Sequence, residues 1–249
     1  MNIIFLGILG SVISGWLATS LGGLVVLFFN RFDARSYSAM LSFSAGVMLA
    51  ASFFSLLVPA LGYGNFWMVV VGFIMGVVFL EICDALVPHE HFLKGREGVS
   101  GVRLKRISLF NLAITIHNFP EGFSVGVGFA GEGVHRAIAL AIGIGIQNIL
   151  EGAAVALPLV AQGYSRRYGC GIASLTGLVE VLGGVIGVML AVMLGSFLPL
   201  ALSFAAGCML YVISGEIIPE CHQQGCSKSS KIWLIVGFIA MMTLDNVFH

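Results

Sequence analysis

Charged residues are scarce in this chain. They account for 10% of its 249 residues, while 58% are hydrophobic, and the mean hydropathy is +1.02. A soluble domain would carry about 25% charged residues. Residues 3–29 and 36–80 contain no charge, and about 20 apolar residues span a bilayer core, so the second run can cross twice. The composition excludes a sizeable soluble domain and predicts a single membrane domain over residues 1–249.

Motifs that would indicate other functions are also missing. The chain has no glycine-rich phosphate loop, so ATP-driven chemistry is not indicated. It lacks the H-E-x-x-H string of zinc proteases, and no Lys or Arg falls within a predicted span to hold an anionic organic substrate. The start of the chain lacks the basic region of a signal peptide, so we expect a retained first helix.

The hydrophobic runs predict an all-α integral membrane protein with eight transmembrane helices. Their expected bounds are 3–29, 37–60, 66–88, 107–130, 137–161, 170–194, 197–220 and 232–249, with breaks at 59–65, 131–135 and 195–199. One long loop, at 89–106, is basic and flanked by histidines.

Basic residues occupy alternate loops of this scheme, which predicts an orientation. Cytoplasmic loops of membrane proteins are enriched in Lys and Arg. With both termini outside, the outer loops hold only Arg136, and the inner loops hold Arg31, Arg35, Lys94, Arg96, Arg103, Lys105, Arg106, Arg166, Arg167, Lys228 and Lys231. The loop at 89–106 is then a cytoplasmic topology anchor, and no nucleic-acid partner is expected.

Two similar strings lie in the middle of the fourth and fifth predicted helices. They are His117-Asn118-Phe119-Pro120-Glu121-Gly122 and Gln147-Asn148-Ile149-Leu150-Glu151-Gly152. The first and fifth residues of each string are i and i+4 on a helix, so they share a face with the second residue close by. Each helix therefore projects a nitrogen or oxygen donor, an amide and a carboxylate into one sector.

Carboxylates are concentrated in the predicted spans rather than in the loops. Those inside or at the ends of helices are Glu81, Asp84, Glu121, Glu151, Glu180, Glu216, Glu220 and Asp245. With no Lys or Arg beside them, such carboxylates need a proton or a cation. A divalent metal ion is the economical partner, and protons are the main competitor. Counting from the inner helix ends places His117, Glu151 and Glu180 at one level.

The donor set indicates the kind of metal. Imidazole, carboxylate and amide donors without thiolate suit zinc, iron, manganese or cadmium better than cuprous copper. Amide ligands and unfilled positions weaken a site, as a transported ion requires, whereas closed structural zinc sites are four-coordinate and rich in Cys. An intramembrane metal-dependent enzyme remains the alternative, although H-x-x-x-E does not match the Glu-x-x-His of di-iron proteins.

The two strings, joined by Glu180 in Gly177-Leu178-Val179-Glu180, resemble the Zrt-/Irt-like protein (ZIP) family of divalent-metal transporters, most closely its GufA-like bacterial type. The resemblance covers nearly the whole chain. It implies alternating access without ATP, moving zinc above all, or iron, manganese or cadmium, across the cell membrane toward the cytoplasm. It also implies that a four-helix transport unit slides against a scaffold that forms a homodimer.

The resemblance further implies a binuclear metal centre among helices four, five and six. One position would be formed by His117, Glu121, Gln147 and Glu151, and the second by Asn118, Asn148 and Glu180, with Glu121 and Glu151 bridging. Many members carry aspartate where this chain has Asn148, so three carboxylates here face two divalent ions. We therefore expect the second position to bind metal more weakly or only to regulate.

Other residues match the family outside its centre. Those expected along the cytoplasmic exit are Asp84, His89, His91, Glu216 and Glu220, with Gly215 where members often have His. Asp245 would lie near the outer mouth, and Met48 and Ser55 resemble the outer gate. The segment Cys221-His222-x-x-x-Cys226 is compatible with an exit-side zinc trap or with ordinary reduced cysteines, because its spacing differs from the C-x2-C of a zinc knuckle.

Overall fold

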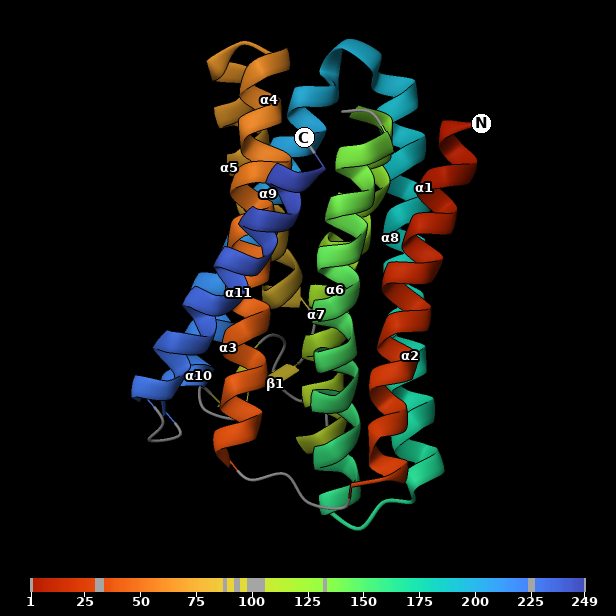
Figure 1. Ribbon diagram of the computed structural model, residues 1–249, viewed down its shortest axis with the longest axis vertical. Coiled ribbons are helices and arrows are strands. Elements are labelled where there is room, and N and C mark those ends of the chain that lie inside the picture. Colours follow the sequence, from red (N-terminus) through yellow and green to blue (C-terminus); the bar gives the residue numbers. More distant parts are fainter. Residues whose placement is uncertain are drawn as a thin grey trace.

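The computed structural model describes residues 2–29, 34–86, 89–91, 95–97, 106–131, 134–223 and 227–248. Within these ranges the side chains at 34, 89–91, 95–97, 106–114, 194, 216, 220, 222–223 and 227 are not described. The described chain is helical apart from one short antiparallel hairpin, in which β1 (His89–His91) pairs with β2 (Gly95–Glu97) (Figure 1).

The first two membrane-length runs are each broken by a π-helical segment. The run that we call helix 1 joins α1 (Ile3–Ser11), the π-helical η1 (Val12–Leu17), α2 (Ala18–Gly23) and the 3-10 turn η2 (Leu24–Leu27). The next run joins α3 (Ala34–Ala50), the π-helical η3 (Ala51–Leu57) and α4 (Val58–Tyr63).

The remaining runs follow the predicted order. They are α5 (Phe66–Leu86), α6 (Arg106–Gly131), α7 (Val134–Ala161), α8 (Arg166–Leu194), the 3-10 turn η4 (Gly195–Phe197) with α9 (Leu198–Val212), the π-helical η5 (Ile213–Ile217) and α10 (Ile218–Gln223), and α11 (Ser227–Val247). The described part of the chain is therefore a bundle of long helices.

Seven of the described helical runs are long and apolar enough to cross a membrane. They include every predicted span except α6, which has a comparable length but carries His117, Asn118 and Glu121 in its middle. These polar side chains lower its hydropathy, so the count of eight crossings stays a prediction.

One predicted break is wrong in detail. The expected break at 59–65 began at Pro59, but the helix continues through that residue and ends at Tyr63, before the extended Gly64. Proline is tolerated within a membrane helix where a local π-helical adjustment re-satisfies the backbone groups that it frees. Pro59 lies directly after such a segment, η3.

The two chain ends lie at the same end of the bundle (Figure 1). The hairpin and the ends at which α3 and α8 begin lie at the opposite end. An even number of crossings places both termini on one side. Arg35, Arg166 and Lys228 belong to the first turns of α3, α8 and α11, at the end away from the termini, and the orientation stays a prediction.

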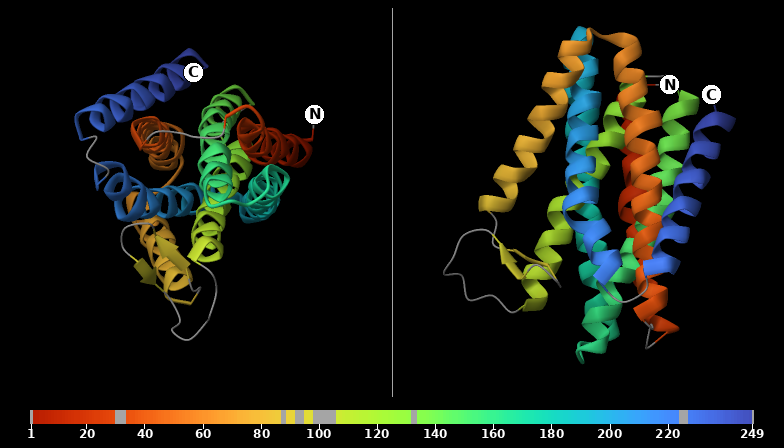
Figure 2. Two further views of the ribbon diagram at one scale, coloured as in Figure 1. Left: turned by 90° about the horizontal axis from the view of Figure 1, so that it is seen from below. Right: turned by 90° about the vertical axis from the view of Figure 1, so that its left-hand side faces the viewer.

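The helices divide into two groups. Helix 1 packs against α6, α7 and α8, and α6 packs most extensively against α8. In the other group α3 packs against α11, and α5 packs against α9. Figure 2 shows the same division when the bundle is viewed along its helices. We call the first group the site bundle and the second the outer bundle.

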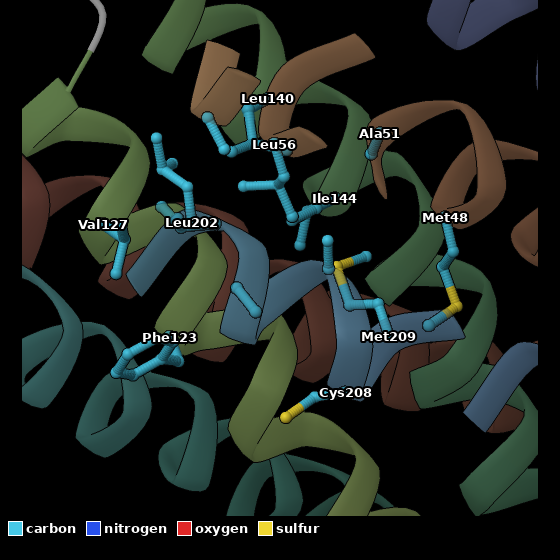
Figure 3. Packing of buried hydrophobic residues seen from close by; sticks show 14 of the residues in the cluster. Met48, Ala51, Leu56, Phe123, Val127, Leu140, Ile144, Leu202, Cys208 and Met209 are labelled. Carbon is cyan, nitrogen blue, oxygen red and sulfur yellow. The ribbon is translucent and has the colours of Figure 1, made fainter. Parts of the chain in front are cut away.

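An apolar cluster joins the two bundles. Phe123 of α6 and Ile144 of α7 lie in one buried cluster with Leu56 of η3 and Met209 of α9 (Figure 3). Met48 belongs to the same cluster and is 1% exposed. Tyr63 Oη of α4 also donates to the carbonyl oxygen of Gly131 of α6 at 3.2 Å, near one end of this contact. Van der Waals packing holds membrane helices together because lipid is equally apolar.

Candidate metal site

Close contact between α6 and α8 places the site in the middle of the site bundle. A Cβ atom built on Gly122 would lie 1.8 Å from the carbonyl oxygen of Glu180, and one on Gly126 would lie 2.1 Å from that of Gly184. On the facing helix, a Cβ on Gly183 would lie 2.3 Å from the Phe119 oxygen. Only glycine permits this approach of two backbones.

The polar side chains of the two strings are buried at this contact. Gln147, Asn148 and Glu180 are 0% exposed, and Asn118 and Glu121 are 1% exposed. Both helices stay regular through their prolines, Pro120 in α6 and Pro158 in α7. His117 and Glu151 are half-buried. Five side chains, three amides and two carboxyl groups, therefore lie where desolvation of any unpaired charge is costly.

Glu180 of α8 is the hub of a hydrogen-bond network. Its Oε1 accepts from Thr19 Oγ1 at 2.9 Å and from Asn118 Nδ2 at 3.0 Å. Its Oε2 accepts from Asn148 Nδ2. The carboxylate therefore connects helix 1, α6, α7 and α8, and three donors compensate its burial.

The orientation of the Asn148 amide follows from its neighbours. Its Nδ2 also donates to the carbonyl oxygen of Ser14 at 2.8 Å. Both neighbours, a carboxylate and a backbone carbonyl, accept hydrogen bonds, so the NH₂ group must face them. The amide oxygen consequently points away from Glu180.

Several acceptor atoms remain without donors at the same place. Among the described residues, the buried oxygens with no hydrogen-bond partner include both carboxylate oxygens of Glu121, Oδ1 of Asn118, Oε1 of Gln147 and Oδ1 of Asn148. Buried acceptors are rarely left without a donor, and each one lowers stability by about 1–3 kcal/mol. All five atoms are oxygens that can accept hydrogen bonds or coordinate a cation.

The remaining predicted ligands lie around these acceptors. Glu121 lies near Glu151 and Glu180, and Glu151 lies near His117. Gln147 Nε2 donates to Glu151 Oε1 at 3.1 Å, as expected for i and i+4 on a helix. The structure thus brings all seven predicted centre residues into one region.

The acidic groups and imidazole are not by themselves arranged around an ion. Within the described part of the chain, no group of three or more His, Cys, Asp or Glu side chains is placed to hold a metal. Glu180 is turned toward amide donors instead. An ion bound here would therefore take amide oxygens among its ligands or require a side-chain rearrangement.

The residues expected outside the centre fall in the outer bundle or beyond it. Asp84 is 7% exposed on α5, and near it Tyr211 Oη donates to Glu81 Oε2 at 2.7 Å. Ser55 Oγ donates to Asp245 Oδ1 at 2.8 Å, which joins η3 to α11. Met48 lies in the apolar cluster between the bundles.

The expected exit residues are described only in part. His89 and His91 lie on β1, Glu216 in η5 and Glu220 in α10, and their side chains fall outside the description. Cys221 is buried, and its carbonyl accepts from Ser38 Oγ at 3.0 Å and Ser230 Oγ at 3.1 Å. The side chain of His222 and the whole of Cys226 are not described, so the zinc-trap alternative stays open.

Helix 1 is the contributor that the sequence did not reveal. Thr19 and the Ser14 carbonyl both contact the centre, but neither belongs to a recognisable metal-binding motif. The available signal was the set of small hydroxyl residues Ser11, Ser14, Thr19 and Ser20 within an otherwise apolar run. Such residues often bond across membrane helices.

The helices define a polytopic membrane protein, and its centre is rich in buried oxygen acceptors. The sequence model described as ZIP zinc transporter matches residues 89–245. The zinc transporter GufA of Myxococcus xanthus is 40% identical, covering 96% of this chain and 97% of that protein. The zinc transporter ZIPB of Bordetella bronchiseptica is 38% identical, covering 94% and 78%. The zinc transporter ZIP11 of Homo sapiens is 34% identical, covering 97% of each.

This chain therefore belongs to the ZIP zinc transporter family. It is a multi-pass membrane protein. The relatives are named as transporters and not as enzymes, so the interpretation as an intramembrane metal-dependent enzyme is set aside.

Proposed function

We propose that this protein carries zinc across the cell membrane toward the cytoplasm by alternating access, and that the ion binds among α6, α7 and α8. The observation that carries this proposal is the set of buried oxygen acceptors without donors on Asn118, Glu121, Gln147 and Asn148. A divalent cation satisfies several acceptors at once and offsets the charge of Glu121 and Glu151. The names of the relatives supply the identity of the metal.

The first metal position would use Glu121, Gln147 and Glu151, with His117 at its edge. These side chains offer oxygen and imidazole donors, which suit zinc and also iron, manganese and cadmium. Two of the ligands, His117 and Glu151, are half-buried, whereas the others are buried. A partly exposed ligand pair leaves a route by which the ion can leave.

The second metal position is weakened by hydrogen bonds within the protein. Asn118, Asn148 and Glu180 would form it, but both asparagine NH₂ groups already donate to the Glu180 carboxylate. An aspartate at position 148 could not donate such a bond and would repel Glu180. The amide thus favours a Glu180 carboxylate that is closed to a second ion, and it leaves the amide oxygens of Asn118 and Asn148 to the ion in the first position.

This feature predicts the metal stoichiometry. The parent protein should bind one zinc ion tightly, and Asn148→Asp should add a second tight ion, because a fourth carboxylate is then available and the bond to Glu180 is lost. Equilibrium dialysis of the detergent-solubilised protein measures both values. Two equally tight ions in the parent would contradict the prediction, and Asn65→Asp, outside the helices, is the charge-matched control.

The two-bundle arrangement supports alternating access. The site lies within one bundle, and its contact with the outer bundle is the apolar cluster around Ile144 and Met209 (Figure 3). Apolar surfaces without directional bonds can slide past each other without breaking buried hydrogen bonds. Phe123 and Ile144 lie toward the predicted outer end from Glu121 and Gln147, so this cluster would close the site on that side.

Residues beyond the centre fit an entrance and an exit on this pathway. Asp245, with Ser55 as its donor, would attract cations at the outer mouth, and Met48 would contribute to the apolar gate. Asp84, His89, His91, Glu216 and Glu220 would accept the ion on the cytoplasmic side. The homodimer implied by the resemblance stays a prediction, which light scattering of the solubilised protein would test.

The test of the proposal is flux in liposomes. Purified protein is reconstituted with a trapped zinc-sensitive fluorescent indicator, and zinc is added outside, with protein-free liposomes as the control. We expect saturable influx that iron, manganese or cadmium inhibits in proportion to affinity. Absence of flux for all four metals would overturn the proposed function. Glu180→Ala beside the parent shows whether the first position suffices, in which case flux persists.

A further inference from the structure

Helix 1 contacts Glu180 and Asn148 of the proposed metal centre, although none of its own residues is assigned as a ligand. Thr19 Oγ1 lies 2.9 Å from Glu180 Oε1 and also 2.9 Å from the carbonyl oxygen of Gly15. A hydroxyl has one proton, and an ionised carboxylate is the stronger acceptor of the two. Thr19 therefore holds Oε1 of Glu180 against helix 1.

The local structure of helix 1 makes this contact possible. Ser14 and Gly15 lie in the π-helical segment η1, and such segments are common at functional sites. A Cβ atom on Gly15 would lie 2.7 Å from Glu180 Cβ and 3.0 Å from Glu180 Oε2. The absence of a side chain at Gly15 thus allows Glu180 to lie directly against helix 1.

The contact controls the direction of both asparagine amides. Glu180 Oε1 accepts from Asn118 and Oε2 accepts from Asn148, whose Nδ2 also donates to the Ser14 carbonyl. When the NH₂ group of an amide is held, its oxygen is fixed on the opposite side. The two oxygens that result, Asn118 Oδ1 and Asn148 Oδ1, are both buried acceptors without a donor among the described residues.

We propose that Thr19 is a positioning residue for metal binding, which acts through Glu180 to direct the amide oxygens of Asn118 and Asn148 toward the bound ion. The Ser14 carbonyl is the second support of this arrangement. In this arrangement Glu180 orients the two amides whose oxygens face the ion. The inference rests on the proposed function, since it concerns the same centre.

A matched pair of contacts separates positioning from simple packing. Ser20 Oγ donates to Ser174 Oγ at 3.0 Å, and Trp16 Nε1 donates to the same oxygen at 2.9 Å. These bonds join the same two helices as the bond between Thr19 and Glu180, but they do not reach the centre. Ser20→Ala therefore removes a comparable interhelical bond without disturbing Glu180.

The test compares Thr19→Val, Thr19→Ser and Ser20→Ala with the parent. Valine keeps the shape of threonine but lacks the hydroxyl, and we expect its zinc dissociation constant to rise about 10- to 100-fold, as when an outer partner of a metal ligand is removed. Maximal flux should fall much less than affinity. Thr19→Ser, which restores the hydroxyl, should return to within about twofold of the parent, and Ser20→Ala should match the parent.

Each remaining outcome decides the inference. Parent-like affinity in Thr19→Val, or an equal loss in Thr19→Ser and Thr19→Val at unchanged melting temperature, would overturn it. If Thr19→Val does not fold, Thr19→Ala, which adds no atoms, takes its place with the same expectation. Absence of saturable zinc binding in the parent would instead refute the proposed function.

Discussion

Replacing Glu121 with glutamine is expected to abolish saturable zinc uptake in proteoliposomes. Glu121 is 1% exposed, and neither of its carboxylate oxygens has a hydrogen-bond partner among the described residues. Glutamine has nearly the same shape but carries no charge and one acceptor fewer. Removing a residue that only hydrogen-bonds to a metal ligand lowers metal affinity about 10- to 100-fold. Removing the ligand itself should therefore lower the zinc affinity by more than about 100-fold.

The control for this change is another carboxylate of the spans. Glu81 is exposed on α5, where it accepts a hydrogen bond from Tyr211, and it lies in the outer bundle. Glu81→Gln should keep the zinc affinity of the parent. Uptake by Glu121→Gln at the parent's rate and affinity would show that the ion binds elsewhere, whereas equal losses in both variants would indicate a general effect of charge removal.

Replacing Gly122 with alanine is expected to disrupt the site bundle. The new methyl group would lie 1.8 Å from the Glu180 carbonyl oxygen and 2.5 Å from the carbonyl carbon, both of which are backbone atoms. Backbone cannot rotate away as a side chain can, so α6 and α8 must separate. Overpacking typically destabilises by about 1–3 kcal/mol, and a clash with backbone belongs at the upper end or beyond.

The expected readout is a lower melting temperature in detergent together with loss of zinc uptake. Gly171→Ala is the matched control, because Gly171 lies on α8 and a Cβ atom there would meet nothing within 4 Å. That variant should be as stable as the parent or more so, since alanine favours helix by about 1 kcal/mol over glycine. A Gly122→Ala protein with unchanged melting temperature and flux would show that α6 and α8 are further apart than the structure has them.

Much of the fold follows from the sequence because lipid imposes a simple rule. A segment that crosses a bilayer must be long, apolar and internally hydrogen-bonded, so hydropathy locates it. The run at 134–161 and the run at 166–194 therefore lie close to their predicted bounds. The break after the second helix was misplaced because a proline beside a π-helical segment is tolerated within a membrane helix.

The sequence by itself determined which polar groups form the centre. His117, Glu121 and Glu151 could be singled out because burying an ionisable side chain in an apolar membrane span costs free energy. Such residues therefore usually mark a functional site. Helical periodicity placed each set on one face of its own helix. Family membership then rests on the same strings, together with the matches over nearly the whole chain.

Only the tertiary structure decided how these groups are held. The bonds from Thr19 to Glu180 and from Asn148 to Ser14 join residues 161 and 134 positions apart. Periodicity within one helix cannot predict such pairs, because they depend on how different helices pack and on how closely glycines let their backbones approach. The direction of each amide is set by acceptors that are far away in the sequence, and residue types alone do not predict these contacts.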